Sequence, residues 1–372
     1  MPTRQGTPFP FEGPVSPDLL IDREQELDVL ARRAADRVSV RLVAPRRYGK
    51  TSVLLAHAER LDRTGWRTVH VDLSRVADLT DVARRVAVGY APLDSPWIRS
   101  HLSGLLARLG VSLSAAGPAI SIGPRPSGSE AATAESVLVS LLDLPRALHE
   151  RDAGPTLVVF DEFQDLLVAR KGLDGLLRSR IQYHGDAAAY VYAGSEPSMM
   201  RELFDTRERP LFGQADALAL SPLPLDVVLT ELTARFLDDG LDPGPALGEL
   251  VAFANGHPQR TMWLAYLLAD ALGSGAEPTP ATAAAVVSTA IERTAPSHQA
   301  VWQQSPATER AVLAAVADGV APTSQALAAE HGVARTTLGA AAERLADRGH
   351  LVRDRAGSRL VDPLLAEWLR RR

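Results

Sequence analysis

The stretch VSVRLVAPRRYGKTSVL, from Val38 to Leu54, decides the fold. It starts as an apolar, β-branched run, breaks at a basic turn, and continues with the apolar spacing of a helix, which predicts a strand, a loop and a helix. In this arrangement the backbone N–H groups of the loop and the positive end of the helix converge on an anion. The stretch therefore indicates a phosphate-binding loop.

This loop matches the consensus GxxxxGK[ST] at Gly49, Lys50 and Thr51, with Ala44 in place of the first glycine. The lysine of such a loop reaches the β- and γ-phosphates, and the threonine hydroxyl binds Mg²⁺. The chain contains only two lysines, Lys50 and Lys171, and an arginine fork cannot replace a compact ammonium group here. The alternative is an ordinary strand, basic turn and helix. The expected nucleotide contacts are Ala44, Pro45, Arg46, Arg47, Tyr48, Gly49, Lys50, Thr51 and Ser52.

Two later strands are predicted to end at polar residues. The segment LVVFDEFQD, from Leu157 to Asp165, passes from four apolar residues directly into Asp161 and Glu162, and AAAYVYAGS ends at Ser195. Paired carboxylates at a strand end suit Mg²⁺ and water, so Asp161 is expected to hold the metal and Glu162 to orient the attacking water. Strands separated by helices predict right-handed crossovers, a parallel sheet and a ligand at the carboxyl ends of the strands.

The segments APRRYGKTS, FDEFQDL, AGSEPSMM and LVDPLLAEWLRRR, in this order, resemble the archaeal-type ATPases of the AAA+ and STAND class of P-loop NTPases. The resemblance covers nearly the whole chain. It implies an ATPase module, a helical lid and a C-terminal winged helix, with ATP or ADP and Mg²⁺ as cofactors. Many members of this class are regulatory switches, so the resemblance defines the chemistry better than the biological role.

The resemblance also implies roles for residues outside the two main motifs. Ser195 would be the first sensor of the γ-phosphate, although a Gly-Ser turn without a ligand is the alternative. Arg209, or its neighbours Arg201 and Arg207, would stabilise transition-state charge as an arginine finger in the same chain or in a neighbour. Asp22 is placed to cap the helix that follows, and Arg23 would lie beside the adenine, unless this segment is only an amphipathic lead-in helix without nucleotide contact. The lid would contribute Pro258 and Arg260, the latter as a second sensor.

Composition limits the other possibilities. The chain has 372 residues and no cysteine, which excludes a disulfide framework and a cysteine-ligated zinc site. Its net charge of −5 argues against coating of nucleic acid by the whole molecule. Nothing resembles a signal peptide or an apolar run of eighteen residues, so a cytoplasmic protein without membrane contact is expected. The predicted domains are an extended arm at 1–20, a P-loop α/β domain at 21–222 with an insertion at about 94–134, an all-α lid at 223–303 and a winged helix at 304–372.

The predicted winged helix is the expected place for DNA contact. Helical patterns are followed by two short strands, and the turn at His331, Gly332 and Val333 has helix-turn-helix spacing. From position 306 onward there are ten arginines and eight acidic residues, a modest basic excess. The expected DNA contacts are Arg335, Thr336, Thr337, Arg353, Arg355 and Arg359.

Taken together, the residues predict an ATP-binding ATPase that hydrolyses slowly and uses its nucleotide state as a switch. Three alternatives remain open. The protein could be a DNA-bound loader or transposition-type ATPase, a sensor that signals through a protein partner or a homo-oligomer, or a hydrolysis-poor nucleotide-binding scaffold.

Overall fold

The computed structural model describes residues 7–113, 120–122, 130–354 and 357–372. The chain divides into two compact units. One comprises Glu24–Ala44 and Val53–Leu220; the other comprises the N-terminal segment up to Arg23, the loop Pro45–Ser52 and Ser221–Arg372. In the described ranges no helix is long and apolar enough to cross a membrane.

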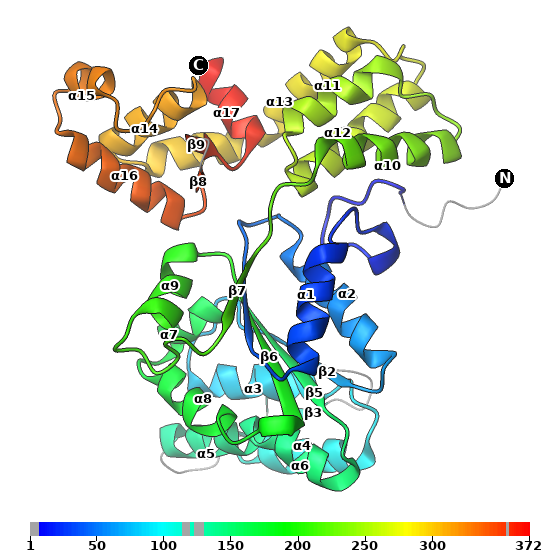
Figure 1. The fold of residues 1–372 in the computed structure, drawn as a ribbon, viewed down its shortest axis with the longest axis vertical. Coiled ribbons are helices and arrows are strands. Elements are labelled where there is room, and N and C mark those ends of the chain that lie inside the picture. The colour runs from blue at the N-terminus through cyan, green and yellow to red at the C-terminus, as the bar shows by residue number, and fades with distance from the viewer. Residues whose placement is uncertain (1–6, 114–119, 123–129, 355–356) are drawn as a thin grey trace. The chain divides into compact units, whose positions relative to one another are not determined.

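The first unit is built on a five-stranded parallel sheet in the order β2-β5-β6-β1-β7 (Figure 1). Its strands are β1 (Val40–Val43), β2 (Arg67–Asp72), β5 (Thr156–Asp161), β6 (Ala188–Gly194) and β7 (Asp216–Ala219). Every residue of β5 and β6 is buried, as expected for parallel strands covered on both faces. This confirms the predicted α/β fold class, and adds an edge strand, β7, that the sequence pattern did not predict.

Helices cover both faces of this sheet. They are α1 (Glu24–Ala35), α2 (Lys50–Asp62), α3 (Leu79–Tyr90), α4 (Pro96–Ala107), α5 (Glu130–Leu142), α6 (Leu144–Asp152), α7 (Leu166–Ala169), α8 (Leu173–Ile181) and α9 (Pro197–Asp205). Figure 1 shows α1 on one face and α3, α4 and α5 on the other. A short antiparallel hairpin, β3 (Val111–Leu113) and β4 (Ile120–Ile122), lies within the predicted insertion.

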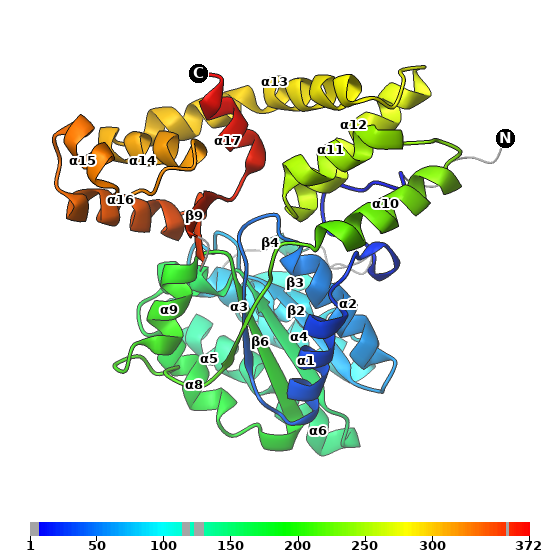
Figure 2. The same cartoon turned by 45° about the horizontal axis from the view of Figure 1, so that its top comes forward.

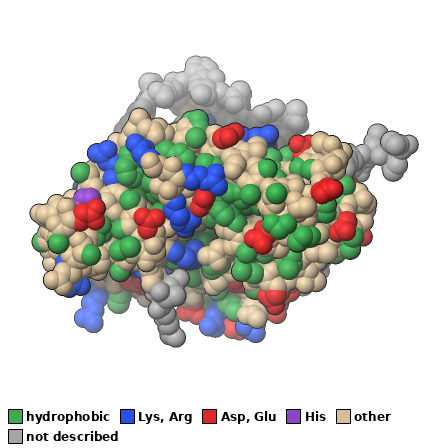
Figure 3. All heavy atoms as spheres, turned by 90° about the horizontal axis from the view of Figure 1, so that it is seen from above, with side chains coloured by type: hydrophobic (Ala, Val, Ile, Leu, Met, Phe, Trp, Pro, Cys, Tyr) green, Lys and Arg blue, Asp and Glu red, His purple; other side chains and the backbone are tan. Residues whose placement is uncertain are grey.

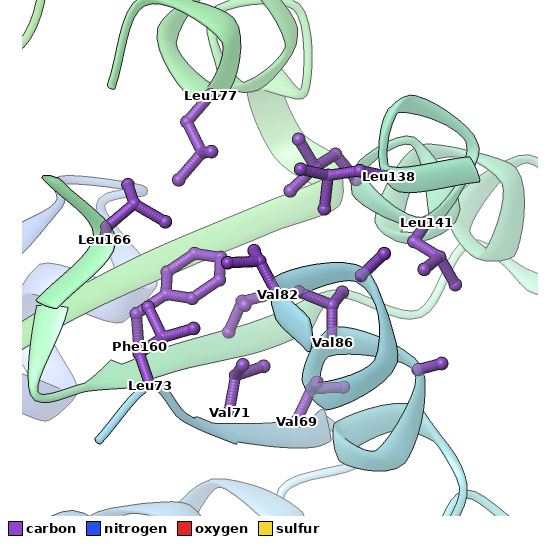
Figure 4. Packing of buried hydrophobic residues seen from close by; sticks show 14 of the residues in the cluster. Val69, Val71, Leu73, Val82, Val86, Leu138, Leu141, Phe160, Leu166 and Leu177 are labelled. Carbon is purple, nitrogen blue, oxygen red and sulfur yellow. The ribbon is translucent and has the colours of Figure 1, made fainter. Parts of the chain in front are cut away.

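The main core lies between the sheet and the α3–α5 layer. Phe160 of β5 points into this core with Val69 and Val71 of β2, opposite Val82 and Val86 of α3 (Figure 4). Alternate strand residues face this side because successive side chains of a strand point to opposite faces. The ring of Phe160 stacks against Tyr190 and Tyr192 of the neighbouring strand, with centroids 6.4 and 6.1 Å apart. This packing fixes the register of β5, and with it the position of the acidic residues that follow.

The second unit contains the helices after the sheet. They are α10 (Leu225–Asp238), α11 (Gly244–Ala254), α12 (Pro258–Gly273), α13 (Pro280–Gln304), α14 (Ala307–Ala317), α15 (Gln325–His331), α16 (Arg335–Asp347) and α17 (Pro363–Arg370). An antiparallel hairpin of β8 (Leu351–Asp354) and β9 (Gly357–Leu360) precedes α17. The order of three helices followed by a hairpin is the one expected for a winged helix. Figure 2 shows α13 as one long helix shared by the lid helices and these elements.

The N-terminal segment packs on the lid helices of the same unit. Phe9 is buried against Phe236 of α10, with ring centroids 4.4 Å apart. Arg235 donates hydrogen bonds to the carbonyl oxygens of Pro8 and Leu19, at 3.3 and 3.1 Å. A buried guanidinium therefore satisfies backbone acceptors that the extended segment cannot pair by itself. The proposed four-part domain division remains a prediction.

Candidate nucleotide-binding site

The predicted phosphate loop connects β1 to α2. The N–H of Ala44 donates to the carbonyl of Gly194, 3.3 Å away, so the sheet ladder continues one residue past β1. The loop then turns, with Gly49 at a φ of 80°, a conformation that side chains rarely adopt, and α2 begins at Lys50. The first N–H groups of a helix have no partner within the helix and form an anion site. The local structure is therefore that of the predicted strand, loop and helix.

Side chains of the loop differ in their surroundings. Lys50 and Ser52 are buried, whereas Arg46 and Arg47 are exposed. The hydroxyl of Ser52 accepts a hydrogen bond from the N–H of Val15, at 3.1 Å, so part of the N-terminal segment is tied to the loop. This contact was not predicted, because the sequence carries no signal for a pairing between residues 37 positions apart.

Tyr48 of the loop contacts elements of the C-terminal region. Its side chain is only 1% exposed, and its ring centroid lies 5.1 Å from that of His257. The phenol oxygen accepts a hydrogen bond from Nη1 of Arg359 on β9, at 3.4 Å. Arg359, which the sequence assigned to DNA, is thus a neighbour of the phosphate loop.

The acidic pair lies at the end of β5. Asp161 is 6% exposed, and its Oδ1 accepts the N–H of Glu162 at 2.9 Å. Nε2 of His70, on the adjacent β2, lies 3.8 Å from Asp161 Oδ2. Glu162 has a φ of 51°, in the left-handed region. In a non-glycine residue the left-handed conformation destabilises the folded state by roughly 1–2 kcal/mol. Residues in such conformations cluster at functional sites.

Ser195 reaches the acidic pair. It follows β6, the strand beside β5, and its hydroxyl donates to Oε2 of Glu162 at 2.7 Å. Nε2 of Gln164 donates to the same oxygen at 2.6 Å. The sheet order places β6 between β5 and β1, so the ends of these strands lie at one edge. Sequence reasoning found Ser195 and Glu162 but missed their contact and the participation of Gln164.

The arginine near α9 has acidic partners. Arg209 forms an ion pair with the buried Asp174, at 3.5 Å, and a second one with Glu202. Arg201 donates to the carbonyl of Pro197 at 3.4 Å. The assignment of Arg209 as an arginine finger stays a prediction, and this pairing would have to break before the guanidinium could reach a phosphate.

Arg260 of the lid is paired with Asp362. Pro258 opens α12 as predicted, and Nε and Nη2 of Arg260 donate to the two carboxylate oxygens of Asp362, at 3.0 and 2.5 Å. Burial alone would raise the pKa of Asp362, but Arg260 and the nearby His298 hold this pKa well below its usual range. The pair joins the lid to the start of α17. The second-sensor role of Arg260 remains a prediction.

Arg23 is buried and bonded within its own unit. Its side chain is 2% exposed and donates to the carbonyl of Ser221 at 2.8 Å. The expected cap at Asp22 is wrong, because α1 begins at Glu24 and both Asp22 and Arg23 have positive φ values, 52° and 109°. The turn shifts the helix start by one residue and directs Arg23 away from solvent.

Comparisons with known proteins bear on the fold. No protein-family model and no curated protein matches the chain. Solved structures do match. A Walker-type ATPase of Pyrococcus abyssi has a TM-score of 0.68 at 19% identity, covering 98% of this chain and 100% of that one. The ORC2 protein of Aeropyrum pernix, in its ADPNP–ADP complexes, has a TM-score of 0.60 at 16% identity, covering 98% and 96%.

This chain has the fold of these two proteins. The match extends over nearly the full length of both chains, lid and C-terminal elements included. The resemblance inferred from the sequence motifs is therefore confirmed at the level of fold.

One buried histidine in α2 makes stability depend on pH. His57 is 0% exposed, neither ring nitrogen has a hydrogen-bond partner among the described residues, and burial, with Arg60 nearby, lowers its pKa from 6.5 to about 4. The unfolded chain therefore binds a proton between about pH 6.5 and 4 that the folded chain does not. The contribution of His57 to the free energy of unfolding is complete above pH 6.5 and falls as the pH drops through this window.

We predict that His57→Leu removes part of this pH dependence. At pH 7 the variant should be about as stable as the wild type, and at pH 5 it should be more stable by about 2 kcal/mol, because the difference follows from the shift in pKa. Urea denaturation at the two pH values measures the change, with His331→Leu at an exposed position of α15 as the control. An equal decrease in stability for wild type and variant would show that His57 is not responsible.

Proposed function

We propose that this protein is an ATP-binding ATPase that acts as a nucleotide-dependent switch of the AAA+ or STAND type. One observation carries the proposal: a phosphate loop with Lys50 and Thr51 starts where β1 ends, and an acidic pair starts where β5 ends, at the same edge of the sheet. Ligands of open α/β sheets bind at this edge.

Each residue has a chemical role in this proposal. The ammonium of Lys50 and the N–H groups of the loop bind phosphate oxygens. The oxygen donors of Thr51 and Asp161 suit Mg²⁺, which keeps several waters and takes few protein ligands; when bound, the metal neutralises charge on the β- and γ-phosphates. Glu162 accepts a hydrogen bond from the attacking water and aligns it with the γ-phosphate. Ser195 holds the carboxylate of Glu162.

The comparisons support adenine nucleotides as the ligand. The ORC2 protein of Aeropyrum pernix is solved with ADPNP and ADP and, separately, in an ADP form. The Pyrococcus abyssi protein is described as a Walker-type ATPase.

The C-terminal elements support a switch. The shared helix α13 and the pair of Arg260 with Asp362 connect the lid helices to α17. Tyr48 of the phosphate loop contacts both His257 of the lid and Arg359 of the hairpin. A change in the loop on nucleotide binding would therefore be transmitted directly to the lid and to β9. The sensor alternative differs from this proposal because it requires a protein partner, and the scaffold alternative differs because it hydrolyses little ATP.

Duplex DNA is a second candidate ligand. Arg335, Thr336 and Thr337 are exposed at the start of α16, the position at which a helix-turn-helix meets base edges and phosphates. Arg353 is exposed on β8, and its Nη1 lies 3.8 Å from Oε1 of Glu343. Arg359 donates a hydrogen bond to Tyr48. Arg355 lies outside the described residues. Figure 3 shows Lys and Arg side chains gathered near the middle of one face, with acidic side chains scattered on both sides. DNA binding would therefore be weak and strongly dependent on salt.

The first prediction from the proposed function concerns ATP binding. Lys50→Ala should raise the dissociation constant of ATP·Mg²⁺ by roughly 10- to 100-fold, because hydrogen bonds to charged groups contribute about 1.5–3 kcal/mol. Isothermal titration calorimetry measures the constant. Lys171→Ala, which removes the other lysine of the chain from an exposed position, should bind like wild type. An unchanged constant for Lys50→Ala would refute the phosphate-loop assignment.

The second prediction concerns hydrolysis. Glu162→Gln keeps the size of the side chain but removes the carboxylate that aligns water, so ATP should still bind while turnover falls by roughly 10²-fold or more. Phosphate release under saturating ATP measures turnover, with Glu150→Gln at an exposed position of α6 as the control. Wild-type turnover in Glu162→Gln would direct attention to Asp165, whose carboxylate accepts the N–H of Arg75 at 2.6 Å.

The third prediction concerns DNA. A double variant, Arg335→Ala with Arg353→Ala, should bind duplex DNA more weakly, and the slope of log affinity against log salt should decrease by close to ~0.9 for each phosphate that the protein no longer neutralises. Titrations at several salt concentrations, with turnover recorded with and without DNA, measure both effects. Arg99→Ala, at an exposed position of α4, is the control. Absence of wild-type binding at low salt would rule out this candidate.

A further inference from the structure

The carboxylate of Glu162 is held by two donors on one oxygen. Nε2 of Gln164 and Oγ of Ser195 lie 2.6 and 2.7 Å from Oε2 of Glu162. The donors come from different elements: Gln164 from the 3₁₀ turn Phe163–Asp165 that follows β5, and Ser195 from the end of β6. Two donors that converge from separate elements fix both the position and the rotation of the carboxylate.

The orientation of the Gln164 amide follows from chemistry. A carboxylate oxygen only accepts hydrogen bonds, so the amide must present its N–H₂ group to Glu162. Its own oxygen, Oε1, is then buried without a hydrogen-bond donor among the described residues, in a side chain only 1% exposed. A buried acceptor without a partner destabilises the folded state. Packing alone would be served better by an apolar side chain of similar size.

The neighbouring backbone is adapted to this glutamine. A Cβ at Gly194, the residue before Ser195, would lie 2.7 Å from Gln164 Oε1 and 2.5 Å from Met200. A side chain at position 194 would therefore force Met200 and the Gln164 amide to move. The unpaired oxygen of Gln164 and the left-handed backbone of Glu162 are two unfavourable local features around one carboxylate, and such features persist where the surroundings and a function retain them.

We infer that Gln164 is a positioning residue for ATP hydrolysis, which acts with Ser195 to hold the Glu162 carboxylate in the orientation that aligns the attacking water. This inference rests on the proposed ATPase function and adds a residue to its site. It also gives Ser195 a defined partner, because its hydroxyl is engaged by Glu162. Neither residue transfers a proton or touches the phosphate in this role.

The test compares kcat, KM and thermal stability. Gln164→Leu removes the donor and the unpaired oxygen together, so kcat should fall roughly 10-fold, since one hydrogen bond to a charged group is removed, while KM for ATP stays within about twofold of wild type. The melting temperature should be unchanged or higher. A structural role would instead lower the melting temperature and raise KM. Gln182→Leu, at the exposed position directly after α8, is the matched control.

Variants of Ser195 test the second donor. Ser195→Ala should lower kcat to a similar extent, and Ser195→Thr, which keeps the hydroxyl, should restore it. The double variant Gln164→Leu with Ser195→Ala should approach the turnover of Glu162→Gln.

The outcomes separate the two proposals. If Glu162→Gln abolishes turnover and Gln164→Leu retains wild-type kcat, the inference about Gln164 is refuted and the ATPase function stands. If the wild type neither binds nor hydrolyses ATP, both are refuted.

Discussion

Burial of β5 on both faces is the constraint on which the site depends. All six residues of this strand are buried, and Phe160 is locked between neighbouring aromatic rings and α3. Inside such a sheet a carboxylate would be buried away from water with few hydrogen-bond partners, which is unfavourable. Carboxylates are therefore accommodated at the end of the strand. Asp161 and Glu162 stand there, and a shift of β5 by one residue would exchange its two faces. The packing of the hydrophobic core thus determines the position of the two carboxylates on which the proposed function depends.

Local patterns predicted the central part of the fold correctly. The strand, loop and helix from Val38 to Leu54 and the acidic end of β5 depend on apolar spacing and turn residues that are contiguous in sequence. Strand β7 was missed because its four residues, Asp216–Ala219, are mostly exposed and carry little apolar alternation. As an edge strand it is held by backbone pairing with β1. Backbone pairing places few demands on the side chains, so the sequence gives little indication of this strand.

The contacts of the site were harder to predict than its residues. Ser195 and Glu162 could be named from strand ends, but their hydrogen bond joins positions 33 residues apart. The pair of Arg260 and Asp362 joins positions 102 residues apart, and the contact of Arg359 with Tyr48 spans 311. Residue type indicates that a buried charge needs a partner, but it does not indicate which one. The partners Asp362 and Tyr48 were therefore not predicted, while the assignments of Arg260 to nucleotide and of Arg359 to DNA stay predictions.

Several unfavourable features lie at or near the candidate site, and others occur elsewhere among the described residues. His57 is buried without ring partners among the described residues in the helix that follows the phosphate loop, Gln164 buries an unpaired oxygen beside Glu162, and Glu162 itself has a left-handed backbone. In the core of the same unit, large side chains such as Phe160 and Tyr192 pack against one another and their neighbours. Local rules of packing and polar satisfaction are most often broken where function requires a particular geometry. The same reasoning explains why Gln164, and not an apolar residue, occupies a position that packing alone would give to leucine.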